Sequence, residues 1–269
     1  MTTEPLVVGR PPRSRAGVRR KVVYAGIAVA TVAIYVHAWR DIGGSFGALI
    51  SGFGNLWDLI RRSLPPNLGV LHASIDAMIV TLDTALIGTT IALVLSLLIT
   101  PLAAKNIAPR RWAYEAARVV IAFTRTIPSF IFALYLVVVV GLGPYSAALA
   151  IAIHSIGTLG KLFGETIEDM DTGPVDALRA SGAGRGHVFM HAVLPGVAPT
   201  LVSLTLYRFD VNVRDSLATG FVGGGGIGFL LFTSIQLFQY RAATTELLVL
   251  LVVLLAVERV STILRSRIV

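Results

Sequence analysis

Five charged or amide side chains interrupt an otherwise apolar stretch, and they are the residues in this chain best suited to bind or gate an ion. They are Arg208, Asp210, Asn212, Arg214 and Asp215. A charge at the centre of a bilayer costs about 3 kcal/mol unless it is paired or in contact with water. At about 100° per residue, Arg208, Asn212 and Asp215 share one face of a helix, and the other two residues share nearly the opposite face.

Two interpretations of these charges stay open. In the first, Arg208 and Arg214 steer or gate an anion while the aspartates hold them in place. In the second, all four charges form structural ion pairs. If one face pairs within the chain and the other lines a central path shared with a second copy, the protein is a homodimer. We also expect Asp83, in an earlier apolar segment, to be a paired charge.

An arginine and a run of glycines are further candidates for a transport path. Arg125 precedes Pro128 in an apolar segment, where it either leads an anion inward or extends to the membrane interface. The glycines that follow the charged stretch permit close backbone approach, and they form either a flexible gate or a contact for an external partner. A phosphate cradle is less well supported because no P-loop lysine accompanies them. These glycines are Gly223, Gly224, Gly225, Gly226 and Gly228.

The residues that usually carry enzymatic chemistry are missing or badly placed. Cysteine is absent, which excludes thiolate metal sites and cysteine nucleophiles. Only His187 and His191 have a ligand-like spacing, and no carboxylate motif accompanies them. The chain also contains no Gly-x-x-x-x-Gly-Lys-[Ser/Thr] loop for ATP. We therefore expect no catalytic residue, no metal site and no cofactor in this chain, with a membrane-embedded enzyme as the alternative.

The composition is that of a membrane protein. The mean hydropathy is +0.77, and 55% of the residues are hydrophobic while 14% are charged. The net charge of +8 would suggest nucleic-acid binding in a soluble protein. Here Lys and Arg lie at the ends of apolar segments, where they set membrane topology. We therefore expect membrane lipid, and no nucleic acid, around this chain.

Six apolar segments are long enough to cross a bilayer as helices. Because backbone polar groups must be satisfied inside hydrocarbon, and no alternating strand pattern is visible, the fold class is predicted to be all-α. A cleaved signal peptide is the alternative for the first segment, but its apolar core exceeds the usual length of about 15 residues. The predicted spans are 22–39, 75–100, 113–142 with a kink at Pro128, 145–162, 199–219 and 246–264.

The basic residues predict the orientation. With six spans, the main Lys and Arg clusters fall on one side, so both termini are expected in the cytoplasm. The predicted segments are a basic cytoplasmic N-terminus 1–21, the first span 22–39, an external loop 40–74 with an interfacial helix, a membrane core 75–264 and a cytoplasmic tail 265–269.

Residues 165–195 form the cytoplasmic segment that we call the projecting loop. Pro174 suits the first turn of a helix that runs to about Ser181. Gly182 then permits a sharp reversal, and a second short helix over 188–194 ends at Pro195. A protruding helix-turn-helix of this kind fits a surface cleft of a partner, whose rigid movement it would transmit to the flanking spans.

The projecting loop resembles that of bacterial ABC-importer permeases, whose pattern is Glu-Ala-Ala, three residues, Gly, nine residues and Ile-x-Leu-Pro. The chain matches this pattern at Ala177, Gly182, Leu194 and Pro195. It departs from the pattern at Asp176, Leu178 and Ala192. Segments 165–174, 206–214 and 220–228 also resemble the phosphonate-type permeases. The resemblance extends from about Arg118 to the C-terminus, whereas the first hundred residues match only in hydropathy.

The resemblance implies a type I ABC-importer permease fold in the bacterial cytoplasmic membrane, with six transmembrane helices and a short cytoplasmic coupling helix. It implies a second copy of this chain, a pair of cytoplasmic ATPase subunits that bind ATP and Mg²⁺, and an extracytoplasmic substrate-binding lipoprotein. The implied cargo is phosphonate, phosphate or a related oxyanion. The implied ATPase-coupling residues are Asp176, Ala177, Leu178, Gly182, Leu194 and Pro195.

Two alternatives remain beside this interpretation. An ABC permease for an amino acid or another small solute would share the same loop. An energy-independent channel or carrier would need no ATPase partner, although no internal inverted repeat is evident to support a secondary transporter.

Overall fold

The computed structural model describes residues 15–43 and 45–268, so most of the predicted N-terminal segment 1–21 lies outside the described residues. The chain divides into two compact units, 1–60 and 61–269, which are described separately. In the first unit, α1 (Arg15–Asp41) is long and apolar enough to cross a membrane. The amphipathic helix α2 (Phe46–Ser63) begins there, within the segment 40–74 for which the sequence predicts an external loop with an interfacial helix.

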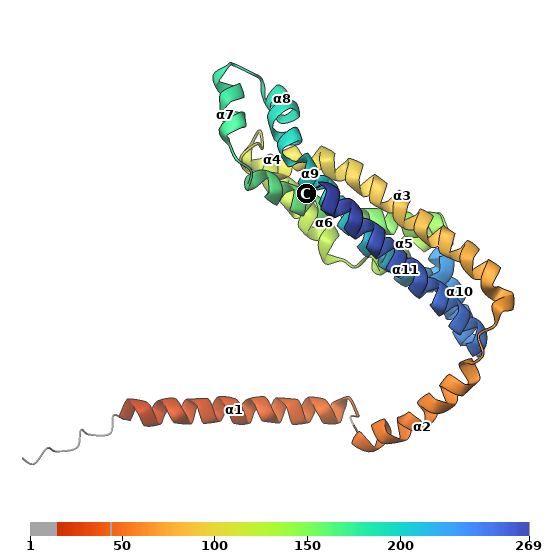
Figure 1. Ribbon diagram of the computed structural model, residues 1–269. Coiled ribbons are helices and arrows are strands. Elements are labelled where there is room, and N and C mark those ends of the chain that lie inside the picture. The colour runs from red at the N-terminus through yellow and green to blue at the C-terminus, as the bar shows by residue number, and fades with distance from the viewer. Residues whose placement is uncertain (1–14, 44, 269) are drawn as a thin grey trace, which may run out of the picture. The chain divides into compact units, whose positions relative to one another are not determined.

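The second unit is built from helices and short helical turns, and the described residues contain no strand (Figure 1). This agrees with the all-α fold class predicted from the apolar segments. The helices are α3 (Leu71–Ala103), α4 (Arg111–Thr126), α5 (Ser129–Val140), α6 (Pro144–Glu168), α7 (Gly173–Ala180), α8 (Arg185–Val188), α9 (Leu194–Thr219), α10 (Gly226–Gln236) and α11 (Tyr240–Ile268). The helical turns are η1 (Leu68–Val70), η2 (Phe189–Val193) and η3 (Gly220–Gly224).

Helix α6 is the centre of this unit, because it packs against α3, α4, α5 and α9. Small residues let its neighbours approach closely. At Gly157, for example, an added Cβ would lie 2.6 Å from the backbone nitrogen of Arg125. Closer to the C-terminal end of α6, Leu159 and Phe163 are fully buried in a core shared with α3 and α9.

The described helices account for the predicted spans. Five helical stretches are long and apolar enough to cross a membrane, and a sixth is obtained if the bent pair α4–α5 is one span. The predicted kink at Pro128 is a full break, with an angle of 89° between the two helices. Proline lacks an N–H and pushes the preceding residue out of the helical region, and Ile127 accordingly has an extended conformation. The freed Ile127 carbonyl lies 2.9 Å from Nδ1 of His154.

The glycine segment, for which the sequence suggests a flexible gate or a contact for an external partner, contributes to two helical elements in the structure. It forms the turn η3 and then starts α10, a short apolar helix that the sequence analysis did not predict. Gly223 and Gly225 have φ values of +96° and +74°, which side-chain-bearing residues rarely adopt. The amide of Ile227 donates to Oγ1 of Thr81 on α3 at 2.9 Å. The segment is therefore packed inside the fold.

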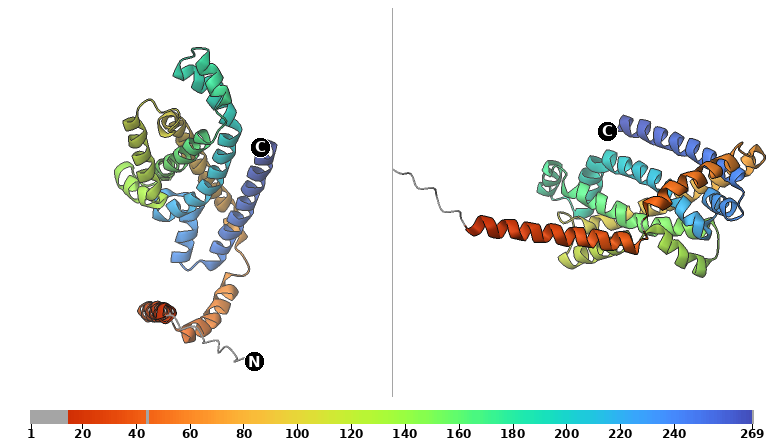
Figure 2. Two further views of the ribbon diagram at one scale, coloured as in Figure 1. Left: turned by 90° about the vertical axis from the view of Figure 1, so that its left-hand side faces the viewer. Right: turned by 90° about the horizontal axis from the view of Figure 1, so that it is seen from below.

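The projecting loop extends beyond the other helices of the second unit at one end (Figure 1, Figure 2). Its first helix, α7, ends one residue before the predicted end at Ser181, and Pro174 lies in its first turn as predicted. The prediction that a separate second helix ends at Pro195 is wrong, because the helix continues from Arg185 into α9. The π-helical turn η2 widens the helix just before Pro195, which accommodates a residue without an N–H.

Candidate functional site

A buried polar network joins α3, α6 and α9 at the first face of the charged stretch. Arg208 donates from Nε to Oγ of Ser155 at 3.0 Å, and its Nη2 lies 3.2 Å from Oδ2 of Asp215. Ser155 donates to Oδ1 of Asn212 at 2.9 Å. Asn212 in turn donates from Nδ2 to Oγ1 of Thr89 at 2.8 Å. One continuous chain of hydrogen bonds therefore crosses three helices, and we call these five residues the α9 network.

The burial of the α9 network makes its pairing energetically important. Asn212 is fully buried, and the side chain of Arg208 is 7% exposed. Removing one partner of such a buried pair typically costs about 3–5 kcal/mol, since the other charge is left uncompensated. Asp215 keeps 29% of its side chain exposed, so one edge of the network reaches the surface of the chain.

The opposite face of α9 carries a second ion pair. Nη1 of Arg214 lies 3.2 Å from Oδ2 of Asp210, one helical turn away. Nη2 of Arg214 also lies 3.6 Å from Oε2 of Glu258 on α11. Asp210 is buried, whereas the side chain of Arg214 is 46% exposed. The division of the charges between two faces is as the helical spacing predicts, and each of the four has an ionic partner within the chain.

The other predicted charges have different surroundings. Arg125 is exposed at the end of α4, and the described residues offer it no side-chain partner. The expectation that Asp83 is paired is wrong for the described part of the chain, where its exposed side chain has no counter-charge. Both residues lie in helices that the apolar pattern assigns to the membrane, so each needs water or a second chain nearby.

Sequence reasoning missed a buried carboxyl group between α10 and α11. Glu246 is 1% exposed and accepts a 2.7 Å hydrogen bond from Oγ of Ser234 on its Oε1. Its Oε2 has no hydrogen-bond partner among the described residues. No signal in the sequence identifies this pair. Glu246 is the first residue of a predicted span, so the sequence suggests a charge at the membrane interface.

The projecting loop shares a hydrophobic core with the membrane helices. Val175 of α7 and Val188 of α8 are buried in the same cluster as Leu159, Phe163 and Ile167 of α6. The cluster continues through Val193 into α9 and also includes Ala92 of α3. A displacement of the loop must therefore move the ends of α6 and α9 or break this core, since packed interiors do not deform continuously.

Hydrogen bonds tie the projecting loop to the α3–α4 connection as well. Arg179 donates from Nη2 to the Asn106 carbonyl, and Arg185 donates from Nη1 to the Pro109 carbonyl, each at 3.3 Å. Asn106 itself donates to the Ile167 carbonyl at 2.8 Å. The loop, the α3–α4 connection and the end of α6 therefore form one joined end of the unit.

The predicted coupling residues divide into an exposed and a packed group. Asp176, Ala177 and Gly182 are exposed on the outer surface of the loop. Leu178 and Leu194 are half-buried against the core cluster, while Pro195 is exposed in the first turn of α9. Gly182 has a φ of +82°, so the reversal depends on a glycine at this position.

The two histidines with ligand-like spacing are stacked on each other. The ring centroids of His187 and His191 lie 4.0 Å apart, with planes inclined by 21°. Nδ1 of His191 lies 3.0 Å from the His187 carbonyl. Stacked rings with one nitrogen directed at the backbone do not converge on a common point, so this pair offers no chelating geometry.

Residues 92–269 match the model of the protein family described as binding-protein-dependent transport system inner membrane component. A putative phosphite transport system permease protein of Stutzerimonas stutzeri is 35% identical over 92% of this chain and 87% of its own length. A phosphate-import permease protein of Mycolicibacterium smegmatis is 40% identical over 78% of this chain and 40% of its own length.

A solved structure supports the same fold. The MetNI methionine ABC transporter in an inward-facing conformation contains a chain with a TM-score of 0.63 to this one, at 20% identity. The alignment covers 75% of this chain and 98% of that chain. At this level of identity the likeness concerns the fold alone.

Proposed function

The chain belongs to the family of binding-protein-dependent transport system inner membrane components, and we propose that it carries phosphonate, phosphite, phosphate or a related oxyanion inward across the membrane. As a permease subunit it provides the path, and ATP hydrolysis takes place in a separate protein. The proposed complex contains two copies of this chain, a pair of cytoplasmic ATPase subunits that bind ATP and Mg²⁺, and an external substrate-binding lipoprotein.

The observation that carries the coupling mechanism is the core shared by the projecting loop and the membrane helices. Val175 and Val188 of the loop pack into one cluster with Phe163 of α6. An ATPase that holds the exposed surface around Ala177 and Gly182 would move the loop as it closes on ATP. The shared core would pass this movement to α6 and α9, which alternately opens the path to the two sides of the membrane.

The charges on α9 support a path for an anion. Buried charges could all be structural, but the exposed portions of Arg214 and Asp215 leave each pair in contact with the surface of the chain. In the proposed dimer the face of α9 that carries Arg214 borders the central path, and Arg214 attracts the oxyanion while Asp210 fixes the arginine side chain. Arg125, which is exposed and has no side-chain partner among the described residues, provides a further cation for the anion at the cytoplasmic half of the third span.

The choice of cargo is supported by the relatives. Their names specify phosphite and phosphate transport, and their sequences are 35% and 40% identical to this chain over the aligned residues. The methionine transporter shares the fold at 20% identity, which says nothing about cargo. Import of an amino acid and passive transport by a channel are therefore the outcomes against which the proposal is tested.

The first test is to purify the tagged chain from its native host in mild detergent and to identify the co-purified proteins by mass spectrometry. An ATPase in equal amount to the permease supports the importer. Recovery of the chain alone, repeated after crosslinking, would instead favour a channel or carrier.

The second test measures transport directly. The recovered complex is placed in proteoliposomes with its lipoprotein, and uptake of labelled phosphite, phosphate, methylphosphonate and methionine is compared with and without ATP. The proposal expects ATP-dependent uptake of at least one oxyanion and none of methionine. Uptake of methionine, or oxyanion flux without ATP, would contradict it.

A further inference from the structure

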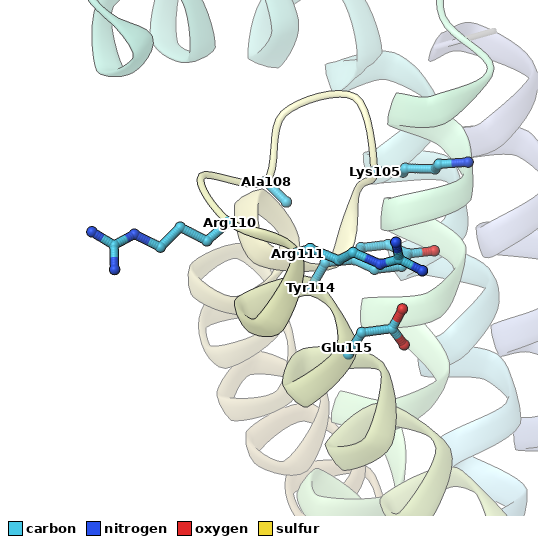
Figure 3. A pocket seen from close by; sticks show the side chains of 6 residues that line it. All are labelled: Lys105, Ala108, Arg110, Arg111, Tyr114 and Glu115. Carbon is cyan, nitrogen blue, oxygen red and sulfur yellow. The ribbon is translucent and has the colours of Figure 1, made fainter.

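A basic hollow lies at the start of α4, at the end of the unit that carries the projecting loop. Its volume is about 470 Å³. Figure 3 shows Lys105 and Arg111 extending to the same side of α4, with Tyr114 and Glu115 next to them, while Arg110 points to the other side. The lining therefore combines three cationic side chains with a single carboxylate.

The three cations of the hollow have no ionic partner in the described part of the chain. Among the described residues, no carboxylate lies within ion-pair distance of Lys105, Arg110 or Arg111, and no hydrogen bond engages their side chains. The neighbouring Arg118, by contrast, is held by Glu168 at 3.4 Å and lies over the ring of Tyr114. Glu168 also accepts from the Lys105 backbone amide at 2.7 Å, so it fixes the connection without neutralising the hollow.

An apolar groove adjoins the basic hollow, and Arg110 lines both. The groove has a volume of about 460 Å³ and lies between α3 and α4. Its walls include Leu102 of α3 and Ala113, Ala116 and Val120 of α4. From Arg110 to Val120 the helix rises about 15 Å, which is half of a hydrocarbon core about 30 Å thick.

The position of the groove matches the edge of a membrane. Trp112 lines it at the Arg110 end and is 67% exposed, as expected for an aromatic side chain at the lipid interface. The Lys and Arg distribution assigns this end of α4 to the cytoplasmic side. The cations therefore lie at the membrane surface, and the apolar groove extends from them to the depth of one leaflet. A phospholipid has its headgroup and its acyl chains in the same order.

We propose that an anionic phospholipid of the cytoplasmic leaflet binds here, with its phosphate group on Arg110, which lines both the hollow and the groove, and one acyl chain in the groove. Arg111 contributes its charge from the other side of α4. Arginine pairs favourably with phosphate through two parallel hydrogen bonds, and Lys105 adds a further charge. A free phosphate would use the basic hollow but not the groove. The site is independent of the transported cargo and does not rest on the proposed function.

Because this lipid would join the α3–α4 connection, to which the projecting loop is hydrogen-bonded, its binding also stabilises that end of the unit. Asn106 and Pro109, which accept from Arg179 and Arg185 of the loop, flank the basic residues in sequence. The immediate test, however, is lipid binding itself.

The test uses the full chain in the complex with which it co-purifies. The complex is delipidated and incubated with vesicles of either phosphatidylcholine alone or phosphatidylcholine with phosphatidylglycerol, and bound lipid is counted by native mass spectrometry. Arg110→Gln with Arg111→Gln should weaken phosphatidylglycerol retention roughly 30-fold, because each basic residue contributes about a fivefold preference. The matched control is Arg259→Gln with Arg267→Gln, which removes two exposed arginines of α11 outside the hollow.

A second variant tests the groove without changing charge. Ala116→Phe fills the groove and should also abolish retention, whereas Val119→Phe adds the same ring to an exposed position of α4 outside the groove and should not. Equal retention of both lipids, or no difference between the variants and their controls, would overturn the proposal. Displacement of the lipid by inorganic phosphate, together with an inert Ala116→Phe, would overturn it in favour of a free-anion site.

Discussion

Arg208 and Asp215 lie two turns apart on α9, with Nη2 of the arginine 3.2 Å from Oδ2 of the aspartate. The pair is buried at the arginine and partly open at the aspartate, and Ser155 of α6 joins it from the neighbouring helix. The same contact therefore stabilises the helix packing and leaves a charged edge at the surface. Structural and transport roles can be separated by comparing single and double variants.

Arg208→Gln should lower the unfolding temperature in detergent, because Asp215 loses its counter-charge. The expected cost lies below the value for a fully buried pair, about 3–5 kcal/mol, because Asp215 keeps 29% of its side chain exposed. Adding Asp215→Asn removes the uncompensated charge and should restore much of this loss. If the double variant assembles but does not transport, the Arg208–Asp215 pair takes part in transport; if it transports normally, the role of the pair is structural. A single variant as stable as the parent would contradict the buried pairing.

Glu246→Gln should leave stability unchanged or improve it. The amide oxygen can still accept from Ser234, and the described residues contain no partner for the second oxygen that the change would remove. Ser234→Ala should be the more damaging change, by about 1–2 kcal/mol, because it leaves the buried Glu246 without its donor. Thermal unfolding of both variants gives the order. The reverse order would show that Glu246 requires its charge.

Gly182→Ala should loosen coupling between ATP hydrolysis and uptake. The φ of +82° at this position costs a side-chain-bearing residue about 1–2 kcal/mol, so the α7–α8 reversal shifts. Gly184→Ala is the matched control, because Gly184 has a φ of −68° and open space around it. The measurement is uptake per ATP hydrolysed in proteoliposomes. Identical ratios for the two variants would exclude a special role for Gly182.

Gly157→Ala should destabilise the packing of α4 on α6. Its Cβ would lie 2.6 Å from the Arg125 backbone nitrogen, and overpacking of this kind costs about 1–3 kcal/mol. Gly186→Ala, at a helical glycine with nothing within 4 Å, should be neutral. Unfolding temperatures of the two variants are compared. A neutral Gly157→Ala would mean that α4 and α6 separate easily, as a moving gate would.

The sequence predicted the helices wherever a long apolar segment was present. It also placed Arg208, Asn212 and Asp215 on one face, because the spacing of residues on a helix is fixed. It did not find α10, since an apolar run of eleven residues is too short to be assigned to the membrane. The sequence analysis placed the end of a helix at Pro195, because proline usually breaks helices. In the structure the π-helical turn η2 accommodates this proline and the helix continues.

By itself the sequence determined that this protein lies in a membrane, that its fold is all-α and that it belongs to its family of transport components. These follow from the hydrophobic composition and from local spacing, which do not depend on distant contacts. Only the tertiary structure decided which groups meet: Arg208 with Ser155, the loop residue Val175 with Phe163, and Glu246 with Ser234. Such contacts depend on how helices that are distant in sequence pack side by side. The residue pattern along one helix does not specify which neighbouring helix it will contact.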